Sequence, residues 1–335
     1  MIEAGRGCPF MCSFCSTSLM WERNFRVKTP ARIHEEMRRL SKGYGLKSFG
    51  LAHDNFTTSH RYVAEFCGHF EKHNVEGFTW SSSARPDTLN LERIQSLYRA
   101  GCRGVFLGVD SGSDRIQKAI RKNLNLNHYR ATLKETVSLD MEVTSSFILG
   151  FPEETEEDLN RTLLLALESR LMGAANVQFH RLAPLAGTPV LERGQSSLSL
   201  RSGPSDVSLL PIPSHEVDLF IERHPQLFSS FYSVRTPHVE NINVSALAVF
   251  CSALINYAAP VLERTLKALG STPTELFDVW MNWRENRYSE NTIEESFVLN
   301  TFGQFIRSLF SSDLKKPTRF SDISRPNFSI HFHSD

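Results

Sequence analysis

The chain has 335 residues, 41% of them hydrophobic, and its 37 basic residues balance 37 acidic ones, so the formal net charge is zero. This composition is ordinary for a globular protein with a buried core, and it gives no reason to expect a nucleic acid or an anionic membrane as a partner. We see no secretory signal and no apolar run near the ~20 residues that cross a bilayer, and six cysteines are too few for a disulfide scaffold, so a reducing, cytoplasmic location is expected.

The first 185 or so residues alternate short apolar runs with amphipathic stretches, which is typical of strands and helices that build a parallel sheet. In chain order, the predicted strands are residues 1–4, 47–53, 77–84, 102–109, 142–151 and 174–185. The predicted helices are residues 30–45, 59–73, 90–101, 113–122, 127–140 and 154–171. The last of these helices contains Thr155 and Asp158 at the spacing of a helix cap. Six such repeats predict an α/β fold, a (β/α)6 partial TIM-like barrel.

The composition changes near residue 190, which we expect to end the barrel unit of residues 1–190. Residues 191–214 are rich in Ser, Pro and Gly and predict a linker or surface loop. Residues 215–315 are expected to form a mostly α-helical C-terminal region, followed by an irregular tail at residues 316–335. Within that region, residues 224–241 concentrate aromatic, His and Arg side chains that would belong to the core or line a substrate pocket.

Three of the six cysteines lie close together near the N-terminus. Cys8, Cys12 and Cys15 form Cys-x3-Cys-x2-Cys beside Gly7 and Pro9, which keep the segment out of a helix. A structural zinc site usually has four protein ligands, and the usual pairing of two CxxC motifs is absent here. An ordinary cubane cluster is held by four cysteines, and the loop contains no fourth cysteine. Three unreactive buried thiols are a further alternative. A [4Fe–4S] cluster with three thiolates and one iron open to a non-protein ligand fits best.

This loop resembles the cluster loop of the radical S-adenosylmethionine (SAM) superfamily, which places an aromatic residue, here Phe14, before the third cysteine. The resemblance implies a [4Fe–4S] cluster on Cys8, Cys12 and Cys15, whose open iron chelates SAM. It also implies reductive cleavage of SAM to a 5′-deoxyadenosyl radical that abstracts hydrogen from a substrate. Such an enzyme is oxygen-sensitive and needs a reductant such as flavodoxin or ferredoxin.

Further matches to the family fall at strand ends, where parallel α/β proteins bind ligands. After the second strand, Asp54 and Phe56 match the family's acidic "DDxF"-like stretch, where the resemblance implies that Asp54 contacts the SAM amino group; a cap or turn residue is the alternative. After the third strand, Ser83 and Arg85 are expected to bind the SAM carboxylate, with a surface salt bridge as the alternative for Arg85.

The fourth and fifth strands end in two more motifs. "GVDSGSD" resembles the family's "GIESGS", so Asp110 is expected at the ribose hydroxyls. "SFILGFPEE" resembles the pattern GxIxGxxE, in which Ile148 would face the adenine and Gly150 and Glu153 match, while Ser146 replaces the first Gly. "PLAGT" after the sixth strand is similar to the family's "PLPGT" region.

The resemblance covers about residues 1–190 and predicts a radical SAM enzyme with an unidentified natural-product, peptide or lipid-like substrate. Relatives in the cobalamin-associated branch carry a cobalamin-binding domain before the radical domain, and none is encoded here. A cobalamin-assisted methyltransferase with its cobalamin module on another chain is therefore an alternative. A non-catalytic metal-binding module is the alternative of another class. We do not expect a tRNA substrate, because the predicted C-terminal region is helical rather than a β-barrel.

Overall fold

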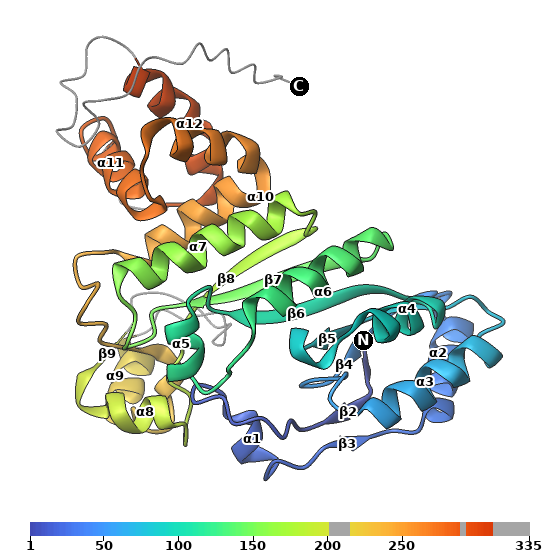
Figure 1. The fold of residues 1–335 in the computed structure, drawn as a ribbon. Helices are drawn as coiled ribbons and strands as arrows, with labels where there is room; N and C mark the ends of the chain where they lie inside the picture. The colour runs from blue at the N-terminus through green and yellow to red at the C-terminus, as the bar shows by residue number, and fades with distance from the viewer. Residues whose placement is uncertain (201–214, 289–292, 311–335) are drawn as a thin grey trace.

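The centre of the fold is a six-stranded parallel sheet (Figure 1). The computed structural model describes residues 1–200, 215–288 and 293–310. The strands are β1 (Ile2–Glu3), β4 (Ser48–Ala52), β5 (Thr79–Ala84), β6 (Cys102–Asp110), β7 (Glu142–Leu149) and β8 (Asn176–Arg181), in that spatial order. Each pairs in parallel with its neighbour, and each lies within or overlaps a predicted strand. The predicted (β/α)6 partial barrel is therefore confirmed.

The connections between these strands are the helices that the sequence predicts. They are α2 (Pro30–Tyr44), α3 (His60–His73), α4 (Leu91–Arg99), α5 (Asp114–Ala119), α6 (Leu126–Ser138) and α7 (Glu156–Leu171). Thr155 and Asp158 form a capping box at the start of α7, as their spacing predicts. Since parallel strands need crossovers of this length, the helices place all six carboxyl ends of the strands at one edge of the sheet.

The two faces of the sheet differ in burial, because side chains alternate along each strand. The face that packs against the helices is apolar, and Phe49, Leu51, Trp80, Val105, Leu107, Val143 and Phe147 on it are at most 4% exposed. The other face carries small and polar residues that remain partly or fully exposed, among them Ser48, Ser81, Ser83, Thr144 and Gln178. Phe106, on the central strand β6, is 37% exposed on this inner face. The barrel interior is therefore lined mostly with small or polar side chains, and Phe106 is an exposed aromatic among them.

A short antiparallel hairpin that the sequence did not predict follows the first strand. It pairs β2 (Gly5–Arg6) with β3 (Arg26–Val27), and the segment between them contains the three cysteines and α1 (Thr17–Met20). The hairpin therefore fixes both ends of the cysteine segment.

The C-terminal region is mostly helical, as predicted. It contains α9 (His215–Arg223), α10 (Val244–Leu269), α11 (Pro273–Glu285) and α12 (Glu295–Phe310). Before it lie α8 (Pro189–Gly194), which extends into the predicted 191–214 loop, and β9 (Leu198–Leu200), which pairs antiparallel with β10 (Tyr232–Val234). β9 lies in the first part of the predicted 191–214 loop. The rest of that loop and the predicted 316–335 tail lie outside the described residues.

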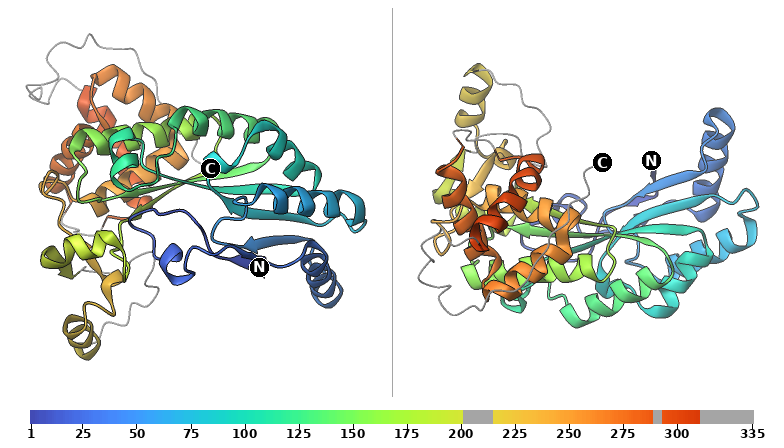
Figure 2. Two further views of the ribbon diagram at one scale, coloured as in Figure 1. Left: turned by 60° about the horizontal axis from the view of Figure 1, so that its bottom comes forward. Right: turned by 90° about the horizontal axis from the view of Figure 1, so that it is seen from above.

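The helix α10 packs at the β8 edge of the sheet, against α7 and β8, with α11 and α12 on its other sides (Figures 1 and 2). Asn256 holds it there: its side chain donates to the Val177 carbonyl at 2.8 Å and accepts from the Val177 N–H at 2.9 Å.

The expectation that no apolar run approaches ~20 residues concerned continuous runs, and α10 reaches that length only as a whole helix. The helix is 26 residues long, and its most apolar window has a mean hydropathy of 1.7, enough to cross a bilayer by length and composition. Ser, Asn and Tyr interrupt its apolar runs, which is why the sequence shows no continuous one. Half of that window is buried inside the fold.

Candidate functional site

The three predicted ligand cysteines lie in one loop between β2 and α1, at the carboxyl-terminal edge of the sheet. All three are free, half-buried thiols. The centre of the loop is braced by Ser13, whose N–H donates to the Ile120 carbonyl at 2.8 Å and whose carbonyl accepts from the Val190 N–H at 3.2 Å.

Gly7 determines how the chain enters this loop. Its φ is +94°, a conformation that other residues rarely adopt, and a Cβ atom there would lie 1.9 Å from the Asn24 carbonyl oxygen. The entry to the cysteine loop therefore requires glycine.

Asp54, which follows β4, attaches the loop to the sheet. Its carboxylate accepts from the Gly7 N–H at 2.5 Å and from the Thr17 hydroxyl at 3.3 Å, so it contacts the residues on either side of the cysteines. It does not cap the following helix, because Ser59 is the N-cap of α3. The predicted contact with the SAM amino group stays a prediction.

Arg85, which follows β5, reaches the loop directly. Its Nη1 donates to Cys12 Sγ at 3.2 Å, its Nε and Nη2 form a fork onto Asp87 at 3.0 and 2.8 Å, and Nη2 also donates to the Lys122 carbonyl at 2.9 Å. The Phe10 ring lies 3.8 Å from the guanidinium carbon. The Arg85 side chain is only 8% exposed and Asp87 is 31% exposed, so the salt bridge is partly buried rather than on the surface.

Asp110, at the end of β6, forms a buried ion pair with Lys122. The Asp110 and Lys122 side chains are 8% and 5% exposed, and Asp110 has a φ of +66°, which few residues other than glycine adopt. The strand register shifts between Gly108 and Asp110, and this irregularity turns the carboxylate toward the loop side. Lys122 was missed by sequence reasoning, because it carries no motif of its own.

Ser83 and Ile148 lie on the inner face of the sheet. The Ser83 hydroxyl donates to the His53 carbonyl at 2.5 Å, which ties the ends of β4 and β5 together. Ile148 packs in a small apolar cluster with Phe14, whose ring meets Phe151 edge to face at 5.6 Å. The structure thus brings the predicted adenine contact and the aromatic residue of the cysteine loop together.

Glu154 is a second residue beside the site that the sequence reasoning missed. It is fully buried, and its Oε2 accepts from the Gly150 N–H at 2.6 Å and the Phe151 N–H at 3.0 Å, while Oε1 has no partner. Burial raises the pKa of its carboxyl group to about 8, although these hydrogen bonds oppose the shift. The motif residue Glu153 is partly exposed and pairs with Arg193 at 3.3 Å instead.

The electrostatics of the thiols follow from burial and from nearby cations. Burial raises the pKa of the Cys12 thiol to about 11, against the opposing effect of Lys122 and Arg85, and burial also raises the pKa of Cys8. Without a metal both thiols are therefore neutral at pH 7, and the thiolates form as metal binds.

The donor set fits an iron–sulfur cluster better than a single ion. Among the described residues, no group of three His, Cys, Asp or Glu side chains is arranged to hold one metal ion. A cubane presents different irons to different thiolates, which allows wider spacing of the sulfurs. Arg85 and Lys122 would place positive charge beside a cluster held here, which is anionic with its thiolates.

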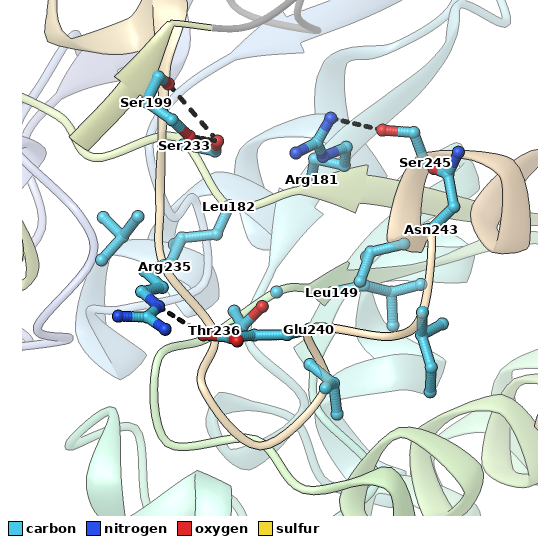
Figure 3. A pocket seen from close by; sticks show the side chains of 15 residues that line it. Leu149, Arg181, Leu182, Ser199, Ser233, Arg235, Thr236, Glu240, Asn243 and Ser245 are labelled. Atoms are coloured by element: carbon cyan, nitrogen blue, oxygen red, sulfur yellow. Dashed lines mark hydrogen bonds and ion pairs between the residues drawn. The ribbon is translucent and has the colours of Figure 1, made fainter. Parts of the chain in front are cut away.

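A pocket of about 340 Å³ adjoins the Gly150 turn, between the ends of β7 and β8 and the segment before α10 (Figure 3). Its lining includes residues from the 224–241 stretch, for which the sequence predicted either a place in the core or a place in a pocket wall. Polar contacts cross it: Arg181 donates to Ser245, Arg235 pairs with Glu240, and the Ser199 and Ser233 hydroxyls are 2.9 Å apart (Figure 3).

Comparison with known proteins gives a family match over the barrel. Residues 2–166 match the protein-family model for the radical SAM superfamily. An uncharacterised methyltransferase of Pyrococcus horikoshii is 29% identical over 192 residues, and a bacteriochlorophyllide d C-12(1)-methyltransferase of Chlorobaculum tepidum is 27% identical over 195 residues. Each match covers 57% of this chain and 41% of the relative. The chain therefore spans about two fifths of the length of these curated relatives.

Solved structures share the fold. OxsB, a cobalamin-dependent SAM radical enzyme solved with aqua-cobalamin and SAM, gives a TM-score of 0.57 at 14% identity over 95% of this chain and 56% of that one. TsrM, a radical SAM methyltransferase from Kitasatospora setae solved with cobalamin and a [4Fe–4S] cluster, gives 0.56 at 15% identity over 76% and 56%. At these identities the likeness establishes the fold alone.

Proposed function

We propose that this chain, which belongs to the radical SAM superfamily, is an enzyme that binds a [4Fe–4S] cluster through Cys8, Cys12 and Cys15 and uses SAM to start a radical reaction. The observation that carries the proposal is the attachment of a three-thiol loop to the ends of parallel strands by Asp54 and Arg85. When bound, the cluster supplies the electron that cleaves the sulfonium C–S bond of SAM, which leaves a 5′-deoxyadenosyl radical to abstract hydrogen from the substrate.

The residues proposed to contact SAM come from consecutive strand ends. Asp110 would bind the ribose hydroxyls. Its carboxylate would then have to accept from these hydroxyls while it remains paired with Lys122. Ile148 and Phe14 would form the apolar wall against the adenine, and the Gly150 turn, held by Glu154, would let the backbone approach it. Asp54, Ser83 and Arg85 would lie near the amino and carboxylate groups, where Arg85 keeps one N–H beyond its four bonds to the described residues.

The substrate is proposed to enter the barrel on the inner face of the sheet. Its small side chains leave room for a ligand, and exposed Phe106 offers an apolar contact on the central strand. A small molecule or peptide fits this space, and a cytoplasmic protein reductant such as flavodoxin or ferredoxin would supply the electron.

A second candidate is a cobalamin-assisted methyltransferase. Two similar relatives are named as methyltransferases, and two solved structures of similar fold contain cobalamin. On this chain the candidate requires a cobalamin-binding partner or further residues.

Anaerobic reconstitution tests the main proposal. The wild-type chain should bind about four irons and four sulfides and show a broad absorbance that Cys12→Ala removes. Cys251→Ala is the matched control, because that cysteine is buried in α10, and it should retain the cluster. With SAM and a strong reductant, the reconstituted chain should release 5′-deoxyadenosine. Stoichiometric zinc without a chromophore, or a full cluster without 5′-deoxyadenosine, would contradict the proposal. Methyl transfer only with added methylcobalamin would favour the second candidate.

A further inference from the structure

We propose that Arg85 is a positioning residue that raises the reduction potential of the cluster held by the cysteine loop, and that Asp87 limits this effect. The inference rests on the proposed function, since it concerns the same loop. It assigns Arg85 a role toward a cysteine ligand, in addition to the expected contact with SAM.

The Arg85 guanidinium contacts the cysteine loop and is also bonded to two residues outside it. Nη1 donates to Cys12 Sγ at 3.2 Å, and the Phe10 ring covers the guanidinium carbon at 3.8 Å, so two loop residues are in contact with it. From outside the loop, Asp87 takes Nε and Nη2 at 3.0 and 2.8 Å, and the Lys122 carbonyl takes Nη2 at 2.9 Å. The fork onto Asp87 orients the guanidinium so that Nη1 points to the sulfur.

Burial makes the charge effective. The Arg85 side chain is 8% exposed, so water screens its charge poorly, whereas the Asp87 side chain is 31% exposed. Hydrogen bonds and positive charge at a cysteine ligand stabilise the more negative, reduced cluster, and this raises the reduction potential. Asp87 bonds to Nε and Nη2 of Arg85 rather than to the sulfur, and its opposite charge is more exposed to water, so it should lower the potential by a smaller amount.

Substitutions of Arg85 and Asp87 should therefore shift the midpoint potential in opposite directions. A nonspecific disruption of the site would not produce opposite shifts. Arg85→Gln should lower the midpoint potential, and Asp87→Asn, which keeps an oxygen to accept from Arg85, should raise it. Arg38→Gln is the matched control, because Arg38 forms an exposed salt bridge with Glu76 on the α2–α3 side. It should leave the potential unchanged.

The experiment is an anaerobic redox titration of each reconstituted chain without SAM, followed by absorbance and electron paramagnetic resonance, with iron content measured in parallel. At the wild-type midpoint, the ratio of reduced to oxidised cluster in Arg85→Gln should fall about tenfold, which is about 59 mV for one electron. In Asp87→Asn the ratio should rise several-fold.

Shifts of both variants in one direction, or no shift in either at full iron content, would overturn the inference. If Arg85→Gln does not retain iron, Arg85→Lys takes its place, because lysine keeps the positive charge but cannot form the fork onto Asp87: a lowered midpoint potential supports the role of Arg85, and an unchanged one refutes it. A wild-type chain that assembles no cluster would refute the proposed function itself, and this outcome differs from every variant-specific result.

Discussion

The buried carboxyl group of Glu154 should make the stability of the fold depend on pH. Its pKa is raised from an ordinary value of 4.5 to about 8, because the group is fully buried with one oxygen unpaired. In the native state the group therefore binds a proton over a pH range in which the unfolded chain has released it. Stability from this group is full below pH 4.5 and is lost as the pH rises through about 8.

The magnitude follows from the two pKa values. Relative to low pH, ionisation of Glu154 in the unfolded chain lowers the free energy of unfolding by about 2 kcal/mol at pH 6 and by about 5 kcal/mol at pH 9. Each pKa unit is worth about 1.36 kcal/mol, and the loss stops growing above the native pKa. Glu154→Gln keeps an oxygen for the Gly150 and Phe151 N–H groups and cannot ionise. The stability of the variant relative to wild type should therefore rise by about 3 kcal/mol between pH 6 and pH 9.

Urea unfolding of both proteins at pH 6, 7, 8 and 9, followed by circular dichroism, measures this difference, and shared ionisations cancel in it. A difference that stays constant within about 0.5 kcal/mol would show that Glu154 ionises in the fold at its ordinary pKa. It would refute the reasoning that burial governs this group.

Two further predictions concern the loop and the buried pair. Gly7→Ala should destabilise the chain by about 1–3 kcal/mol and reduce its iron content on reconstitution, whereas Gly43→Ala, in α2 with nothing within 4 Å of its Cβ, should be neutral or stabilising in the same unfolding assay. Equal effects of the two would show that the close contact with Asn24 relaxes freely. Asp110→Asn and Lys122→Met should each cost about 3–5 kcal/mol in unfolding, and the double variant should cost much less than their sum, because each single change leaves a buried charge unpaired. Additive costs would mean that water reaches the pair.

Most of the barrel could be predicted from the sequence, because strands and helices have local signatures. Alternating apolar runs located all six strands, and cap residues such as Thr155 located helix starts. The β2–β3 hairpin was missed, since two-residue strands have no periodicity to detect.

The candidate site divides in the same way. The cysteine spacing and the order of the strand-end motifs could be identified directly in the amino-acid sequence. The sequence did not show whether Glu153 or Glu154 binds the Gly150 turn. The two residues are adjacent and identical, and only the fold of the turn decides which side chain points inward. Nor did the sequence show the pairing of Asp110 with Lys122, which follows from the irregularity at the end of β6.

The sequence by itself thus determined the (β/α)6 architecture and the three thiol donors, since both depend on patterns within a few tens of residues. Only the tertiary structure decided what surrounds those thiols. Arg85 lies 73 residues from Cys12 in the chain and Asp54 lies 47 from Gly7, and their contacts exist because parallel strands bring their carboxyl ends to one edge. Burial, charge pairing and the resulting pKa shifts depend on those contacts, and no local pattern encodes them.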